Sequence, residues 1–200
     1  GRGAIAQAPD SAVVVFRDVT VIDGSGSPAR SGMSVVIQGE RILAVGRNAD
    51  VAVPSGARVH DLSGKFVIPG LIDAHVHLAP LAAHSRDRLN AELDRMLHGG
   101  IVAMRVMAGP AALHASVRRA ALVHAIPSPD VGFATVVAGP HFMAADPRTR
   151  GRADVLPGVA GAADVPAVVQ EAARSGAIAV KLYAELDSAT MQAAVAEARR

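Results

Sequence analysis

The sequence predicts an α/β protein in which a small β-rich segment precedes an array of alternating strands and helices. Residues 12–64 consist of short β-branched runs separated by turn residues. From residue 65 onward, apolar strand-like segments alternate four times with amphipathic helical segments. Hydrophobic residues make up 50% of the chain and aromatic residues 2%, which indicates a core of small aliphatic side chains. Four consecutive β-α units fit half of a (β/α)8 barrel or a small doubly wound sheet.

The β-rich segment, residues 12–64, is expected to form a small antiparallel unit with hairpins. Turn signals such as Asp23-Gly24 and Gly39-Glu40 separate its runs. The predicted strands are Ala12–Phe16, Val19–Ile22, Met33–Gln38, Arg41–Val45 and Ala57–Leu62. Residues 1–11 are expected to form a disordered tail. Within it, Ala4-Ile5-Ala6 also resembles the small-residue end of a secretory signal, so cytoplasmic and exported locations both stay open.

Residues 65–200 are expected to form the four β-α units. The predicted strands are Phe66–Ala74, Ile101–Met107, Val131–Val137 and Ala177–Tyr183, and the predicted helices are Ser85–His98, Pro110–His124, Pro166–Ser175 and Ser188–Arg199. In the second helix Leu113, Val117 and Leu122 are expected on one apolar face, and in the last helix Met191, Val195 and Ala198. The long segment Ala138–Val165 follows the end of a strand, where loops commonly form active-site walls.

Composition and motifs argue against several classes of function. The net charge is +2, but the basic residues form no stripe with interleaved aromatics, which argues against nucleic-acid binding. No apolar run reaches the length of a membrane span. The absence of cysteine excludes disulfides and thiolate metal ligands. No Gly-x-Gly-x-x-Gly follows a strand, which disfavours a dinucleotide-binding fold.

The strongest candidate site is the pair His75 and His77, which closes the first apolar strand of the β-α array. Alternate residues of a strand point to the same face, so both imidazoles are expected to converge. Two convergent neutral imidazoles form half of a site for Zn²⁺ or another divalent metal. Asp73 is expected on the same face, where its carboxylate can orient one ring.

Lys181 is the second candidate, because it stands inside the apolar run Ala177–Tyr183. Burial lowers the pKa of a lysine and frees its neutral amine. Such an amine can react with CO₂ to form a carbamate, whose anionic oxygens are able to bridge two metal ions. The alternative is an edge lysine whose ammonium reaches solvent.

These motifs resemble the metal-dependent amidohydrolase superfamily. The segment Val67–Leu78, with its Pro-Gly-Leu-Ile-Asp-x-His-x-His signature, looks like that family's first barrel strand. The stretch that ends at Gly70 is similar to the family's N-terminal β-sandwich portion. Leu97–Val106 resembles the second strand, although Val106 stands where Asp is common, and Val180–Ala184 resembles the fourth. The resemblance is strongest to the imidazolonepropionase-like and Xaa-Pro dipeptidase-like branch, and it implies the first half of a (β/α)8 TIM barrel preceded by part of a small β-sandwich.

The resemblance also implies a site and a reaction. His75 and His77 would bind one metal ion, and Lys181 as its carbamate would bridge to a second, so one or two ions of Zn²⁺ or another divalent metal are expected. The reaction implied is hydrolysis of a C–N bond in a small amide, cyclic amide or dipeptide through a metal-activated water. Their places in the sequence also make Tyr183, Arg105 and His141 candidate substrate-binding residues. The alternatives are core packing for Tyr183, a structural ion pair for Arg105 and a surface position for His141.

The family further implies a His from strand five, a His from strand six and a catalytic Asp from strand eight. The 200 residues contain no counterpart of these three, so we assign no catalytic residue and expect negligible hydrolase activity from these residues alone. Two other hypotheses stay open: a truncated, non-catalytic half-barrel that binds metal weakly or associates with a partner, and a half-barrel that pairs with a second copy through its open sheet edge.

Overall fold

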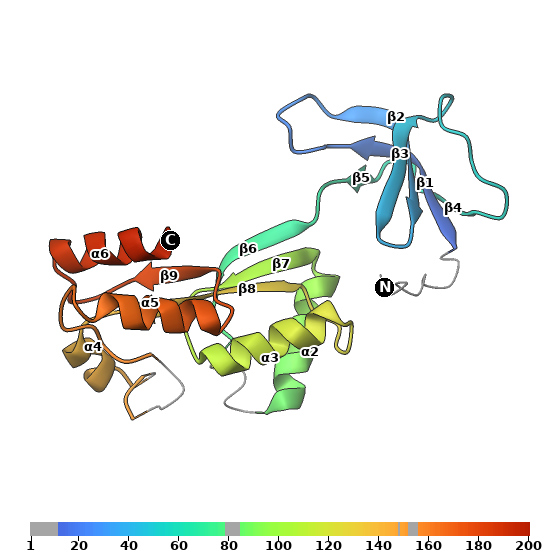
Figure 1. Cartoon of the computed structure of the whole chain (residues 1–200). Helices are drawn as coiled ribbons and strands as arrows, with labels where there is room; N and C mark the ends of the chain where they lie inside the picture. Colours follow the sequence, from blue (N-terminus) through green and yellow to red (C-terminus); the bar gives the residue numbers. More distant parts are fainter. Residues whose placement is uncertain (1–11, 79–84, 148, 152–155) are drawn as a thin grey trace, which may run out of the picture. The chain divides into compact units, whose positions relative to one another are not determined.

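The computed structural model of the chain describes residues 12–78, 85–147, 149–151 and 156–200. The chain divides into two compact units, Gly1–Pro69 and Gly70–Arg200 (Figure 1). The predicted N-terminal tail lies outside the described residues. No helix among the described residues is long and apolar enough to cross a membrane.

The first unit is a five-stranded sheet. Its strands are β1 (Val13–Val21), β2 (Arg30–Gln38), β3 (Arg41–Arg47), β4 (Arg58–Asp61) and β5 (Phe66–Val67). β1, β2 and β3 pair antiparallel, as predicted. β4 and β5 instead pair parallel with β1, so the expectation of a wholly antiparallel unit is wrong. Parallel neighbours cannot be joined by a tight hairpin. The residues between β3 and β4 provide the longer connection that brings β4 beside β1.

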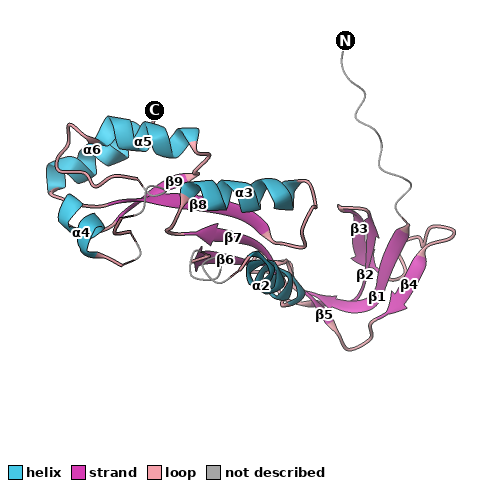
Figure 2. Ribbon diagram, turned by 90° about the horizontal axis from the view of Figure 1, so that it is seen from below, coloured by secondary structure: helices cyan, strands magenta, loops and turns pink. Residues whose placement is uncertain are grey.

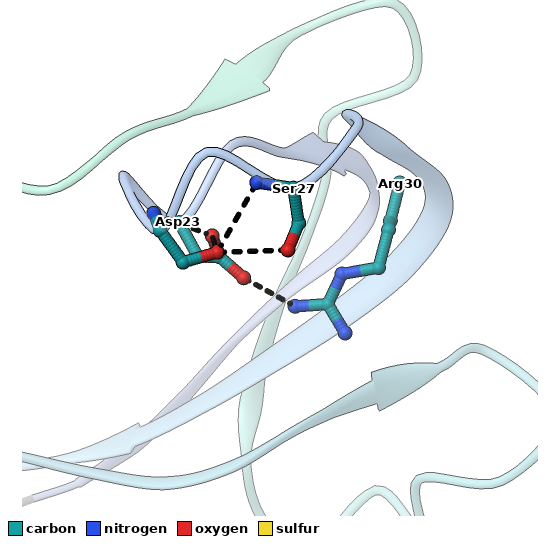
Figure 3. Close-up of polar contacts among 4 residues, drawn as sticks. Asp23, Ser27 and Arg30 are labelled. Carbon is teal, nitrogen blue, oxygen red and sulfur yellow. Dashed lines mark hydrogen bonds and ion pairs between the residues drawn. The ribbon is translucent and has the colours of Figure 1, made fainter.

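The turn between β1 and β2 is held by the carboxylate of Asp23 (Figure 3). It accepts hydrogen bonds from the backbone N–H and the hydroxyl of Ser25, at 3.0 and 2.6 Å, and it pairs with Arg30 at 3.3 Å. The bonds from Ser25 lower the pKa of Asp23, with a smaller contribution from Arg30. Gly24 and Gly26 adopt positive φ here, which a side chain would disfavour.

The second unit is a four-stranded parallel sheet in the order β6-β7-β8-β9, with helices between the strands (Figure 2). The strands are β6 (Leu71–Val76), β7 (Ile101–Val106), β8 (Asp130–Val137) and β9 (Ala179–Leu182). The helices are α2 (Arg86–His98), α3 (Ala111–Leu122), α4 (Pro140–Ala145), α5 (Val165–Arg174) and α6 (Ser188–Ala198). The predicted alternation is therefore present, and the segment expected to be a long loop contains α4. The predicted first strand, Phe66–Ala74, is wrong as one element, because it divides into β5 of the first unit and β6 of the second.

Two apolar cores attach the helices to one face of this sheet. Val76, Val106 and Phe133 meet Leu93 of α2 and Val117 of α3 in the first. The second core joins β8 and β9 to α5 and α6. Because strand residues alternate between faces, the neighbours of these buried residues lie on the opposite side. We call that side the open face; it carries Ile72, Arg105, Val136 and Lys181.

The predicted apolar face of α6 is wrong, and that of α3 holds at Leu113 and Val117 but is wrong at Leu122. In α3 the buried residues are His114, Val117 and Ala121, while Leu122 is 61% exposed at the helix end. In α6 the buried residues are Thr190 and Ala194, whereas Met191 and Val195 are exposed. The buried stripe of α3 includes the polar His114, and that of α6 consists of Thr190 and Ala194, which the apolar periodicity of the sequence does not identify.

His114 is an imidazole inside this apolar packing. The residue is completely buried, and its ring contacts Phe133 at a centroid distance of 5.5 Å. Neither ring nitrogen has a hydrogen-bond partner among the described residues. Burial lowers the pKa of His114 to about 4, and the charge on His77 adds to this shift. The folded unit therefore holds a neutral histidine.

His114 predicts a pH dependence of stability. Its pKa is lower in the folded than in the unfolded state, so its contribution is complete above about pH 6.5 and is lost as the pH falls toward 4. The loss is at most about 3 kcal/mol. His114→Leu removes both the titration and the unsatisfied nitrogens. Denaturant unfolding of both proteins should therefore show the variant gaining relative stability between pH 7 and pH 4. A constant difference between the two proteins across this range would contradict the assignment.

Candidate metal and substrate site

His75 and His77 lie at the carboxyl end of β6. Val76 between them is buried in the first core, so the two histidines point away from it toward the open face. Both residues are exposed, and their ring centroids lie 5.2 Å apart at an interplanar angle of 60°. The structure thus brings the two predicted metal-ligating imidazoles together.

Asp73 has a different partner from the one expected. Its carboxylate oxygen Oδ1 accepts a hydrogen bond from the backbone N–H of His75 at 3.0 Å. The pairing of β6 with β7 shifts register between Asp73 and Val76, so strict alternation fails at this point. Asp73 therefore holds the backbone of His75, and in this way it helps to fix the position from which the His75 side chain projects.

Arg105 lies on the open face of β7. Its Nε donates a hydrogen bond to the carbonyl oxygen of Ala74 at 3.0 Å, directly before His75. This bond links the side chain to the neighbouring strand β6 and leaves the remaining guanidinium N–H groups exposed. Arg105 therefore combines a structural contact with donors suited to a carboxylate.

Lys181 and Tyr183 lie on β9 and just beyond its end, at the other edge of the sheet. Lys181 is half-buried, and its Nζ stands 4.6 Å from the centroid of the Tyr183 ring. The Tyr183 ring in turn meets Phe142 of α4 edge-on, at a centroid distance of 5.2 Å. A cation above an aromatic face is a favourable contact. The burial of Lys181 that the sequence indicated is therefore partial.

His141 begins α4 with its side chain 85% exposed. Its Nδ1 pairs with Oε1 of Glu185 at 2.8 Å, and Oε2 of Glu185 accepts the backbone N–H of Phe142 at 2.7 Å. The hydrogen bond to His141 is the largest cause that lowers the pKa of Glu185, followed by the bond to Phe142. His141 thus belongs to a polar cluster beside the Lys181–Tyr183 pair.

The predicted site residues form two groups on opposite edges of the sheet. The first comprises His75, His77 and Arg105 on β6 and β7, and the second comprises Lys181, Tyr183 and His141 near β8 and β9. Among the described residues, no three side chains of His, Asp or Glu gather closely enough to hold a metal ion. The described part of the chain therefore supplies a pair of imidazoles rather than a complete ligand set.

Sequence reasoning missed two residues of this region, His114 and Glu185. Both had a signal in the sequence. His114 stands three residues before Val117 and seven before Ala121, on what proves to be the buried stripe of α3. Glu185 lies just after β9, and His141 lies just after β8. Because the carboxyl ends of neighbouring parallel strands lie side by side, the two residues could have been expected close together.

No protein-family model matches the chain. Curated relatives match part of it. N-acyl-D-aspartate deacylase from Alcaligenes xylosoxydans xylosoxydans is 40% identical over 76 residues, which are 38% of this chain and 14% of the relative. Imidazolonepropionase from Anaeromyxobacter dehalogenans is 36% identical over 75 residues, 34% of this chain and 18% of the relative. The matches thus cover less than a fifth of each relative.

Among solved structures, a prolidase complexed with N-methylphosphonate-L-proline matches with a TM-score of 0.71 and 25% identity. The match covers 94% of this chain and 53% of the prolidase chain, so the chain spans about half of that protein. The predicted fold class, the first half of a (β/α)8 barrel preceded by part of a β-sandwich, is confirmed. These relatives are hydrolases that act on C–N bonds.

The hydrogen bond that Asp73 accepts from the backbone of His75 predicts an effect on metal affinity. Asp73→Ala removes the acceptor that holds the backbone of His75, and the affinity for Zn²⁺ should fall by roughly 10-fold or more, as for other groups that orient a metal ligand. Asp73→Asn keeps an oxygen acceptor and should bind Zn²⁺ nearly as the wild type does. Competition with a chelating dye measures both affinities. Equal affinities in Asp73→Ala and Asp73→Asn would contradict this role.

Proposed function

The chain belongs to the amidohydrolase superfamily over the portion that its relatives cover, and on that basis we propose that its open face carries part of a metal-dependent site for C–N bond hydrolysis. The proposed substrates are small amides, cyclic amides or dipeptides. The observation that carries the proposal is the pair of exposed imidazoles of His75 and His77, with centroids 5.2 Å apart at the carboxyl end of β6.

The geometry of this pair fits a shared metal ion. Two imidazoles bound at Zn–N distances of about 2.0–2.1 Å with a tetrahedral angle have ring centroids roughly 5 Å apart. The 5.2 Å separation of His75 and His77 agrees with this value without movement of the strand. Zn²⁺ or another divalent metal, one or two ions, is the proposed cofactor. When bound, it would supply the Lewis acidity that activates water and polarises an amide carbonyl.

Lys181 is the proposed third ligand, as a carbamate. Its neutral amine would attack CO₂, forming an N–C bond and releasing a proton. β9, which carries Lys181, is the opposite edge of the sheet from β6, so curling of the sheet turns the two strands toward the same interior.

Arg105, His141 and Tyr183 are the proposed substrate contacts. All three are exposed and lie at the carboxyl end of the strands or on the open face. The free guanidinium N–H groups of Arg105 suit a substrate carboxylate. The ring of Tyr183 and the imidazole of His141 offer an apolar surface and a hydrogen-bonding nitrogen beside the proposed metal ligand Lys181.

The second candidate function is that of a non-catalytic half-barrel that binds metal weakly or associates with a partner. The observation that favours it is the open face itself, where Ile72 is 70% exposed, together with the unpaired outer edges of β6 and β9 within the described sheet. Hydrolysis of an amide substrate by the chain, with loss of that activity in His75→Ala, would favour the hydrolase over the non-catalytic half-barrel.

Zinc content tests the assignment of the two histidines. His75→Ala/His77→Ala should lose bound Zn²⁺, with an affinity loss larger than the roughly 10–100-fold that removal of a ligand's hydrogen-bond partner costs. His98→Ala is the matched control, since His98 is an exposed histidine at the end of α2. Elemental analysis after dialysis gives the zinc bound per chain. Wild-type zinc content in the double variant would refute the assignment.

Labelling with ¹³C-bicarbonate tests the carbamate. The zinc-loaded chain should show a carbamate carbon resonance that disappears in Lys181→Met. Lys65 is the only other lysine in the sequence and is exposed, so Lys65→Met is the matched control and should keep the resonance. A zinc-loaded chain without such a resonance, or one that loses it in Lys65→Met, would exclude carboxylation of Lys181.

A further inference from the structure

We propose that Glu185 is a positioning residue that fixes the ring of His141 in one tautomer and orientation, so that Nε2 is the atom offered to a ligand. The consequence of this positioning for substrate binding rests on the proposed function, in which His141 contacts substrate. The tautomer itself depends only on residues after β8 and β9.

The carboxylate of Glu185 holds two donors from the start of α4. Oε1 lies 2.8 Å from Nδ1 of His141, and Oε2 lies 2.7 Å from the backbone nitrogen of Phe142. An ionised carboxylate only accepts hydrogen bonds, so Nδ1 of His141 carries the proton. In the neutral ring, Nε2 then holds the lone pair. The side chain of His141 is 85% exposed, which leaves this nitrogen accessible.

The backbone is shaped to bring Glu185 to this position. Glu185 adopts φ of +57°, a left-handed conformation that is uncommon for residues other than glycine. Gly139 makes the close approach possible, because a Cβ at this position would lie 2.6 Å from Cβ of Glu185. The N–H of Gly139 also donates to the carbonyl oxygen of Ala184 at 2.8 Å. The loops after β8 and β9 are therefore joined directly beside the carboxylate.

Stability alone does not account for this arrangement. An ion pair between a largely exposed histidine and a partly exposed glutamate contributes little to folding, and a left-handed residue opposes it. What the arrangement does achieve is orientation. The two hydrogen bonds fix both the His141 ring and the adjacent Phe142 backbone, and the Phe142 ring packs on Tyr183 next to Lys181. A neutral His141 then offers an acceptor to a ligand N–H group, such as that of an amide.

Nitrogen NMR of the full chain tests the proposal without metal or substrate. With ¹⁵N-labelled histidine at a pH of about 8, where unperturbed imidazoles are neutral, each ring reports which nitrogen is protonated. His141→Gln assigns the resonances. The wild type should show His141 protonated at Nδ1. Glu185→Gln, whose amide oxygen cannot replace two carboxylate oxygens, should shift the ring toward the Nε2-protonated form.

Two further variants separate positioning from folding. Glu185→Gly suits the left-handed backbone and removes the whole side chain with its carboxylate, so it should fold and still release the ring. Gly139→Ala should displace Glu185 and have the same effect on the tautomer. Glu171→Gln removes a comparable exposed ion pair with Arg174 on α5 and should change nothing at His141. The proposal is overturned if wild-type His141 is protonated mainly at Nε2, or if its tautomer is unchanged in Glu185→Gln and Glu185→Gly. Because these measurements use the chain without zinc, they test the role of Glu185 separately from the proposed metal site.

Discussion

The site depends on the parallel pairing of β6, β7, β8 and β9, which brings the carboxyl ends of all four strands to the same end of the sheet. Backbone hydrogen bonds continue the pairing beyond the strands: Met107 donates to Val76, and Tyr183 donates to Val137. The first of these bonds holds the chain between His75 and His77, and the second places Tyr183 beside Lys181. Chemistry-bearing side chains can therefore come from several strands while the backbone supporting them stays regular.

The two faces of the sheet have different roles: one packs against the helices, and the other carries candidate site residues. The apolar residues that alternate with the site residues bury themselves against the helices, as Val76 does between the two histidines. Packing on one face thus orients the polar side chains on the other. His114 departs from this division, because a polar ring without hydrogen-bond partners among the described residues lies inside the helix layer. Burial is the main cause of its lowered pKa, and the charge on His77 adds to it.

Much of this arrangement could be predicted from local sequence patterns. The spacing of His75 and His77 on an apolar strand predicts their convergence. Four strand–helix repeats predict a parallel sheet covered by helices, and the resemblance to the amidohydrolase superfamily implies that this sheet is half of a barrel. Features that depend on contacts distant in sequence could not be predicted in the same way. The parallel pairing of β4 with β1 joins strands that are distant in sequence, and the register shift after Asp73 lies in the pairing of β6 with β7. The buried stripes of α3 and α6 include the polar residues His114 and Thr190, which the apolar periodicity does not identify. The Glu185–His141 pair needs both the strand order and a left-handed residue.

The central claim is that His75 and His77 together bind a divalent metal at the carboxyl end of β6. The most direct measurement is X-ray diffraction at the zinc absorption edge from crystals of the zinc-loaded chain. We expect an anomalous difference peak within coordination distance, about 2.0–2.1 Å, of one ring nitrogen from each histidine. A peak bound elsewhere, with both imidazoles free of metal, would contradict the account.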